Sequence, residues 1–437
     1  MTDVGCGYAT LVLEDGTCFT GRSCGADGEV VGELCFNTSM IAYTEVISNP
    51  AYAGSILVMT YPQMGNHGVV RADLERDNVE LEALVLSSIC DTPSSFRMDL
   101  SLREFLAEKN VVALEGIDTR ELVRHICMEG SMPAIISTLD HDAKSLLAKM
   151  RDTLESIEDT PVARVSTEAT WTYDAAKCLV TPTAWTAPFP EPCCSIVAID
   201  NGLTRSVLRH LAYAGCATTV VPWDATVEEI WACEPDGVFV SGGPGDPQKA
   251  QDTVDALGGL LGELPILGLG SGQLLLALAA GGVVDKMQVG HNGDNIPVMD
   301  LVTHQVSITA QNHRHTVRFE TLGSLIAEES GGIAAHPLEG DLRFWAQEGC
   351  APVVRNERFG RIQLTHVNVN DGTAEGLRFL DIPALSLQYH PALMPGAQSP
   401  DAAYAAFIQL MEAHAEEVDA LSEKAKAHAE GTGAAHA

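Results

Sequence analysis

The chain has 437 residues, of which 46% are hydrophobic, 5% aromatic and 19% charged. At about 150 residues per domain this length predicts two to three domains, and the composition argues against disorder over most of the chain. Its 26 Lys and Arg stand against 59 Asp and Glu, a formal net charge of −33. Such a surface repels phosphate backbones and anionic lipids, which argues against nucleic acid and a membrane as partners.

The first domain is expected over residues 1–150, where extended segments are followed by helical ones. Ser101, and Asp118 or Thr119, stand directly before amphipathic stretches and can cap helices there. This pattern indicates an α+β domain. The predicted strands include residues 9–14, 56–60 and 83–87.

Residues 151–193 are acidic and rich in Thr and Pro, which predicts a linker. In residues 194–421 apolar strands alternate with helices, which indicates an α/β domain with a mainly parallel sheet covered by helices. Such sheets place their sites at the carboxyl ends of the strands. The predicted strands are residues 195–199, 217–221, 237–240 and 265–269, and the helix after them covers residues 274–280.

A final helix is expected after residues 399–401, because Tyr404, Phe407, Ile408 and Met411 share one helical face. The Ala-rich tail, residues 422–437, is expected to be frayed.

Twelve cysteines without a signal peptide ahead of them predict reduced thiols and a cytoplasmic location. The adjacent pair Cys193 and Cys194 lacks the spacing of zinc ligands. Residues 264–284 carry no charge, but the Pro and Gly residues within them favour a strand, a turn and a helix over a membrane span.

Two glycine-rich turns follow buried strands of the second domain. In residues 241–247 the glycines let backbone N–H groups approach a ligand closely. Residues 268–272 lie between a strand and a helix, the setting of a nucleophile elbow. By themselves, both turns are equally compatible with plain strand-to-helix connections.

Eight motifs occur in order along the chain. They are Phe36-Asn37-Thr38-Ser39-Met40, Thr60-Tyr61-Pro62, Gly65-Asn66, Ile117-Asp118-Thr119-Arg120, Gly243-Pro244-Gly245-Asp246-Pro247, Gln311-Asn312-His313, Asn370-Asp371-Gly372-Thr373 and Gln388-Tyr389-His390-Pro391. Together they resemble the small subunit of carbamoyl-phosphate synthetase. The resemblance implies a family-specific N-terminal domain and a class I glutamine amidotransferase domain. That domain hydrolyses glutamine and passes ammonia to a large subunit, which would carry ATP and Mg, so no cofactor is expected in this chain.

The family uses a cysteine nucleophile, a histidine base and a glutamate that orients the histidine. Here Gly270 occupies the nucleophile position and Ala392 the position of the orienting acid, whereas His390 retains the base. Glycine offers no side chain to attack an amide. We therefore expect the glutaminase site to be degenerate, with His390 a remnant of it.

The glutamine pocket has changed in parallel. Gly243, Gly245 and Asn312 persist among the family's glutamine-contacting positions, and Ser271 replaces a leucine of that pocket. If Arg314 points inward, its bulk and charge would oppose a small zwitterion. The other replacements are Ala51 for serine, Leu274 for glutamine, and Arg314 and His315 for glycine and phenylalanine.

Ser271 lies one residue beyond the elbow, so we expect it to cap the following helix instead of attacking glutamine. His313 and His315 alternate as on a strand and invite a metal assignment. Since His313 belongs to the family motif, a structural role is favoured and no metal site is expected. Most of residues 322–361 looks inserted relative to the family, which suits an added hairpin or a surface excursion.

The leading hypothesis is a non-hydrolysing small subunit in pyrimidine and arginine biosynthesis, which acts as a scaffold for a large subunit that uses free ammonia. A second hypothesis keeps glutaminase activity through Ser271 or a cysteine from elsewhere. A third makes the chain a small-anion sensor, with Arg314 as the counter-charge.

Overall fold

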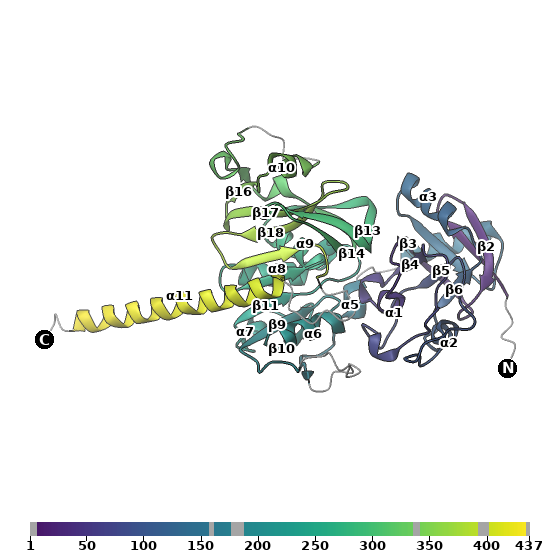
Figure 1. The fold of residues 1–437 in the computed structure, drawn as a ribbon, viewed down its shortest axis with the longest axis horizontal. Coiled ribbons are helices and arrows are strands. Elements are labelled where there is room, and N and C mark those ends of the chain that lie inside the picture. Colours follow the sequence, from purple (N-terminus) through teal and green to yellow (C-terminus); the bar gives the residue numbers. More distant parts are fainter. Residues whose placement is uncertain (1–6, 157–160, 176–187, 335–340, 392–401, 434–437) are drawn as a thin grey trace.

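The computed structural model describes residues 7–156, 161–175, 188–334, 341–391 and 402–433, with the backbone alone for residues 421–433. An N-terminal barrel packs beside a larger domain built on an extended sheet, and a long C-terminal helix projects from that second domain (Figure 1).

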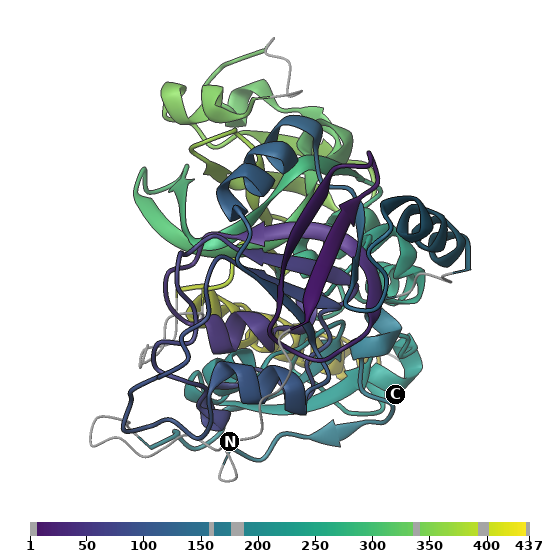
Figure 2. The ribbon, with the colours of Figure 1, turned by 90° about the vertical axis from the view of Figure 1, so that its right-hand side faces the viewer.

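The N-terminal domain is a closed barrel in the strand order β1-β2-β6-β5-β4-β3-β7 (Figure 2). Strands β3 to β6 pair in parallel and the other barrel pairs are antiparallel. With its helices, the barrel confirms the predicted α+β domain. The strands are β1 (Tyr8–Leu13), β2 (Cys18–Ser23), β3 (Glu29–Asn37), β4 (Ser55–Met59), β5 (Ala83–Leu86), β6 (Val112–Glu115) and β7 (Pro133–Ser137); the helices are α1 (Tyr43–Ile47), α2 (Leu102–Glu108), α3 (Thr119–Glu129) and α4 (Ala143–Ser156).

The predicted helix caps are present. Ser101 Oγ accepts the Glu104 N–H (3.2 Å) while a Glu104 carboxylate oxygen accepts the Ser101 N–H (2.8 Å), a reciprocal capping box at α2. Asp118 accepts the Glu121 N–H at 2.9 Å and caps α3.

The second domain has a parallel centre in the order β19-β12-β11-β9-β10. Helices α8 and α9 pack on one face of it, and α6 and α11 pack on the other. This confirms the predicted α/β domain. The elements are β9 (Cys194–Asp200), α6 (Arg205–Tyr213), β10 (Cys216–Pro222), α7 (Val227–Trp231), β11 (Gly237–Val240), α8 (Gln251–Leu260), β12 (Ile266–Leu269), α9 (Ser271–Ala279), β19 (Ala384–Leu387) and α11 (Ala402–Gly433).

Beyond β19 the sheet continues in antiparallel pairs through β18, β17, β13 and β14. Strand β16 pairs with β17, and β15 pairs with β16. The long β13–β14 hairpin reaches the N-terminal domain, where the Thr38 N–H donates to the Asn292 carbonyl (3.1 Å). The strands are β13 (Val283–Asp300), β14 (Val306–Arg318), β15 (Ser324–Leu325), β16 (Val353–Asn356), β17 (Gly360–Asn368) and β18 (Ala374–Phe379).

Parts of the expected linker, residues 151–193, are built into the two domains. Helix α4 runs on to Ser156, Val162 in α5 (Pro161–Val165) enters the second domain's core, and β8 (Trp171–Thr172) pairs with β10. The physical reason is that β10 would otherwise expose an edge of unpaired backbone groups, and β8 covers part of that edge.

Of the two predictions for residues 322–361, an added hairpin or a surface excursion, the structure favours a paired segment that reaches the core. Strands β15 and β16 pair within this segment, and α10 (Arg343–Glu348) carries Trp345, whose side chain is fully buried. Val353 and Val354 are buried as well. The segment therefore forms part of the hydrophobic core.

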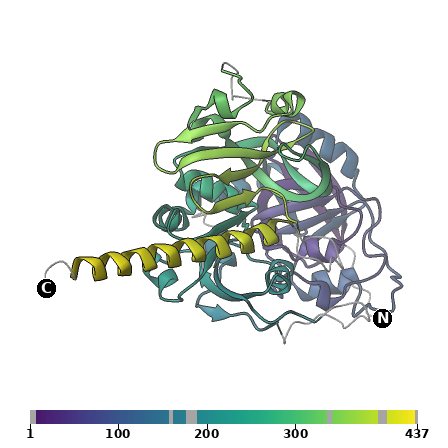
Figure 3. The ribbon, with the colours of Figure 1, turned by 60° about the vertical axis from the view of Figure 1, so that its left-hand side comes forward.

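The tail expected to be frayed is instead helical as far as Gly433, in line with the high helix propensity of its Ala, Glu and Lys residues. Residues 434–437 lie outside the described part. Tyr404, Phe407 and Met411 anchor the start of α11 on the sheet, as their spacing predicted, and the rest extends away from the body (Figure 3). None of the helices in the described ranges has the length and apolar character needed to cross a membrane.

Candidate functional site

The candidate site lies where β11 and β12 end, at the sheet edge that the parallel arrangement predicts. After β12 the chain turns sharply into α9 at Gly270, whose φ of 60° and ψ of −124° are strained for any residue with a side chain. The turn keeps the backbone of a nucleophile elbow. Gly270 itself is the N-cap of α9, so the expectation that Ser271 caps this helix was wrong.

A side chain at position 270 would point at His390. A Cβ placed on Gly270 would lie 2.9 Å from His390 Cε1 and 3.2 Å from His390 Nε2. Position 270 and His390 therefore face each other directly. The first of these distances is shorter than real Cβ contacts, so the ring occupies part of the space that a side chain would need.

His390 follows β19, and its N–H donates to the Ala310 carbonyl (2.9 Å). Burial lowers the pKa of His390 to about 4, so the ring is neutral at pH 7. Among the described residues no carboxylate bonds to it. Ala392, where the family has its orienting glutamate, lies outside the described residues, and its methyl group could not accept a hydrogen bond.

Ser271 Oγ donates to the Gly243 carbonyl at 3.4 Å, and no hydrogen bond in the described part of the chain joins it to His390. The structure thus brings Gly243, Gly270, Ser271 and His390 together, but it leaves the serine without a base. A serine without a base is a weak nucleophile.

The other remnant pocket residues lie elsewhere. Gly245, with φ 77°, contacts Pro161 and lines a cavity of about 390 Å³ between the domains. Asn312 lines a smaller cavity with Asn37 and Tyr52 of the N-terminal domain. Alternating burial along β14 places Asn312 on the opposite strand face from His313, so the two neighbours serve different surroundings.

Arg314 also faces the N-terminal domain. Its guanidinium is 2.9 Å from a Glu33 carboxylate oxygen, and Lys286 Nζ is 2.7 Å from the other oxygen. Burial alone would raise the pKa of Glu33, but the charges of Arg314 and Lys286 outweigh it and lower the pKa. Arg314 is therefore committed to an interdomain ion pair, which removes the support for its role as the counter-charge of an anion sensor.

A second polar cluster lies on the antiparallel part of the sheet and was not found from the sequence. The sequence indicated His315 as the neighbour of His313. The strand register sets His313 opposite His291, and Nε2 of His313 lies 3.2 Å from Nδ1 of His291. His291 Nε2 in turn lies 2.8 Å from Asp371 Oδ2. The presence of His313 and Asp371 in separate motifs was the only sequence signal.

Comparisons with known proteins identify both domains. Residues 11–136 match the family model "Carbamoyl-phosphate synthase small chain, CPSase domain", and residues 197–334 match "Glutamine amidotransferase class-I". The chain is 37% identical over 401 residues to the carbamoyl phosphate synthase small chain of Bacillus caldolyticus, covering 92% of this chain and 96% of that one.

Two further relatives match over a similar share of the chain. The small chain of Thermotoga maritima is 39% identical over 392 residues, covering 89% of this chain and 94% of its own length. The pyrimidine-specific small chain of Bacillus subtilis is 32% identical over 415 residues, covering 95% and 99%. Since the matches span both domains with little left over at either end, the chain belongs to the family of carbamoyl phosphate synthase small chains.

Proposed function

We propose that this chain is a small subunit that does not hydrolyse glutamine and that serves as a scaffold for a large subunit working on free ammonia. The observation that carries the proposal is Gly270, which stands at an intact elbow and faces His390 with no side chain. Amide cleavage in this type of site begins with attack by a side-chain nucleophile. Without one, a base alone cannot form the acyl intermediate.

His390 would be a poor base even if a nucleophile were supplied. Its pKa of about 4 makes the neutral ring a weak proton acceptor at pH 7. No carboxylate among the described residues fixes its tautomer or orientation. The attacking atom and the group that activates the base are both missing, and these two losses support the proposal that the chain does not hydrolyse glutamine.

Exposed apolar side chains support the role of a partner subunit. Met40 and Ile41 are 64% and 60% exposed, and Ile308 on β14 is 60% exposed. Ile41 and Ile308 line one cavity of about 400 Å³, which also reaches Tyr389 and His390. Apolar surface of this kind is typical of an interface. We assign ATP, Mg and bicarbonate chemistry to the large subunit that would cover it.

The names of the relatives support a biosynthetic pathway for this chain, and its free thiols support a location. The name of the Bacillus subtilis relative supports pyrimidine biosynthesis, and arginine biosynthesis draws on the same product. The cysteines in the described ranges carry no disulfide, which supports a reducing, cytoplasmic setting.

The test is synthesis of carbamoyl phosphate by the purified complex with glutamine or with ammonium as the nitrogen donor. We expect ammonium to support synthesis. With glutamine, the rate should be no higher than in a control reaction without any nitrogen donor. Glutamine-dependent turnover equal to or above the ammonium rate would contradict the proposal.

Labelling with a glutamine-analogue electrophile distinguishes the proposed scaffold from a glutaminase that uses a substitute nucleophile. The native chain should remain unlabelled, whereas a Gly270→Cys/Ala392→Glu variant, which restores the family's residues, should be labelled at the introduced thiol. Labelling of Ser271 or of a native cysteine would favour a working glutaminase instead.

A further inference from the structure

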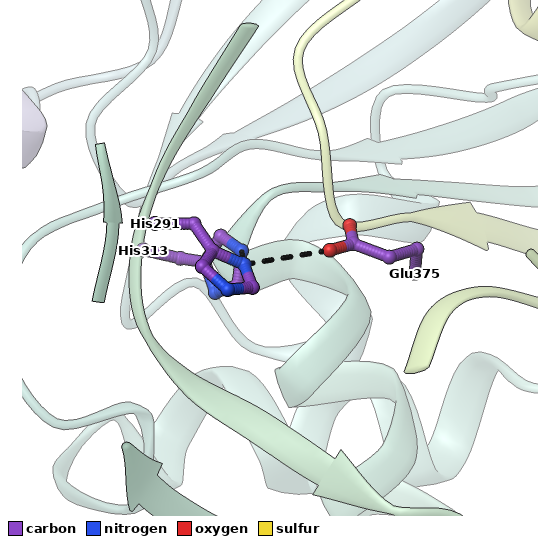
Figure 4. Close-up of side chains that lie close together, drawn as sticks. All are labelled: His291, His313 and Glu375. Atoms are coloured by element: carbon purple, nitrogen blue, oxygen red, sulfur yellow. Dashed lines mark hydrogen bonds and ion pairs between the residues drawn. The ribbon is translucent and has the colours of Figure 1, made fainter. Parts of the chain in front are cut away.

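Three ligand atoms from three different strands converge on the antiparallel part of the sheet (Figure 4). They belong to His291 on β13, His313 on β14 and Glu375 on β18, and all lie within 4.8 Å of one another. His291 Nδ1 is 3.2 Å from His313 Nε2 and 3.5 Å from Glu375 Oε1. In a tetrahedral zinc site with bonds of about 2.0–2.1 Å, ligand atoms are about 3.4 Å apart, so two of the three separations already match.

On the far side of each ring, an acceptor holds a ring nitrogen that must carry a proton. His291 Nε2 donates to Asp371 Oδ2 (2.8 Å), and His313 Nδ1 donates to the His315 carbonyl (2.9 Å). In neutral rings with these tautomers, Nδ1 of His291 and Nε2 of His313 carry lone pairs. Gln311 Oε1, which also only accepts, lies 2.9 Å from that Nε2, so a proton or a cation must stand between the two atoms. Metal-binding histidines show the same pattern, in which the second ring N–H is held by a carboxylate or a carbonyl.

Glu375 adds negative charge to the point of convergence. Its side chain is fully buried, Oε1 accepts from Asn368 Nδ2 (2.9 Å), and Oε2 has no hydrogen-bond partner in the described structure. Gln311 Oε1 lies 2.9 Å from His313 Nε2, and Asn368 Nδ2 lies 3.3 Å from His291 Nδ1. A buried carboxylate oxygen without a partner is costly, and a cation held by both oxygens of Glu375 would satisfy Oε2 as well as bind Oε1, the oxygen 3.5 Å from His291 Nδ1.

We propose that this chain binds one divalent transition-metal ion of the zinc class through His291 Nδ1, His313 Nε2 and the Glu375 carboxylate, with Asp371 as a positioning residue for His291. Two carboxylates would balance the two positive charges of the ion. His313 and Glu375 are buried, and the three protein ligands leave the fourth position of the tetrahedron to a water molecule. The ion would tie the β13–β14 hairpin to β18, and this role is independent of whether glutamine is hydrolysed.

A proton is the rival occupant. Burial disfavours a charged His291, but its bonds to Asp371 and Glu375 outweigh burial and raise the pKa of His291 to about 9. An imidazolium could therefore bridge His313 and Glu375 in place of a metal. Metal and proton compete for the same lone pairs, so direct metal binding at neutral pH distinguishes them.

The experiment titrates Co²⁺ into the untagged, chelator-treated full chain at pH 7.5, with equilibrium dialysis and visible absorption. We expect one Co²⁺ per chain, tetrahedral d–d bands, no thiolate-to-cobalt charge-transfer band, and a higher melting temperature with the ion. His291→Asn and Glu375→Gln should each weaken binding by a hundredfold or more. Asp371→Asn should weaken it about 10- to 100-fold, since it removes only the outer hydrogen bond.

His210→Asn is the matched control, because His210 is also buried but lies on α6, away from the cluster. It should leave Co²⁺ affinity unchanged. Should a buried variant fail to fold, Asp371→Asn still tests the site, because the Asp371 side chain is 41% exposed. The proposal is overturned by absence of stoichiometric binding, by unchanged affinity in the Asp371 variant, or by a thiolate band.

Discussion

At the scale of single residues, Gly270 combines the backbone of an elbow with the absence of a side chain. The positive φ at the elbow is a property of the backbone path between β12 and α9, and glycine adopts it without strain. A Cβ at this position would lie 2.9 Å from His390 Cε1. Adding a side chain to Gly270 therefore meets both backbone strain and the His390 ring.

This predicts that Gly270→Ala destabilises the chain more than Gly281→Ala. Both residues have positive φ, 60° and 80°, but a Cβ on Gly281 would meet nothing within 4 Å. Gly281→Ala should cost about 1 kcal/mol through backbone strain alone, and Gly270→Ala at least twice that, measured by urea denaturation. In a His390→Ala background the extra cost should shrink. Equal losses in the two single variants would show that the ring is no obstacle.

At the scale of elements, the segment between β14 and β17 contributes to the hydrophobic core. Its composition of Gly, Glu and scattered apolar residues does not predict that α10 directs one large side chain into the core. Trp345 is fully buried there and packs in the same cluster as the helices over the parallel strands.

Trp345→Ala is therefore expected to lower the free energy of unfolding by about 3–5 kcal/mol, the usual cost of emptying a buried tryptophan site. Trp231→Ala, at a position 42% exposed, is the control and should cost well under half as much. Denaturant titration followed by far-UV circular dichroism measures both. A loss of about 1 kcal/mol or less for Trp345→Ala would mean that the segment is a dispensable surface addition.

At the scale of the whole molecule, charged residues hold the two domains together. Glu33 of the barrel binds Arg314 and Lys286 of the β13–β14 hairpin. Arg76 binds Asp200 at 2.6 Å and donates through Nε to the Leu203 carbonyl (2.8 Å). Substitutions at Glu33, Arg314 or Arg76 would therefore alter the domain interface.

The pH dependence of stability should report on this interface. The pKa of Glu33 is lowered in the folded chain, so its ion pairs stabilise fully above the ordinary carboxyl pKa of about 4.3 and are lost as pH falls through the lowered value. Glu33→Gln should reduce the free energy of unfolding at pH 7 and make it fall less steeply between pH 5 and pH 2.

Glu121→Gln, which removes an exposed carboxylate on α3, is the matched control for that measurement and should keep the native pH profile. If Glu33→Gln also kept the native profile, Glu33 would contribute nothing to the acid sensitivity of the fold.

The sequence by itself determined the local features and the family. Strand β11 begins and ends where the apolar run predicts, the caps at Ser101 and Asp118 lie where expected, and the elbow falls at Gly270. These features depend on contacts between residues a few positions apart, which periodicity and side-chain type encode directly.

Only the tertiary structure decided what pairs across long separations. It set β8 on the edge of β10, turned Trp345 into the core, committed Arg314 to Glu33, and placed His291 opposite His313. Each of these depends on strand register and on the packing of segments tens to hundreds of residues apart. A shift of one residue in register reverses the face of every side chain on a strand, and no local pattern specifies that register.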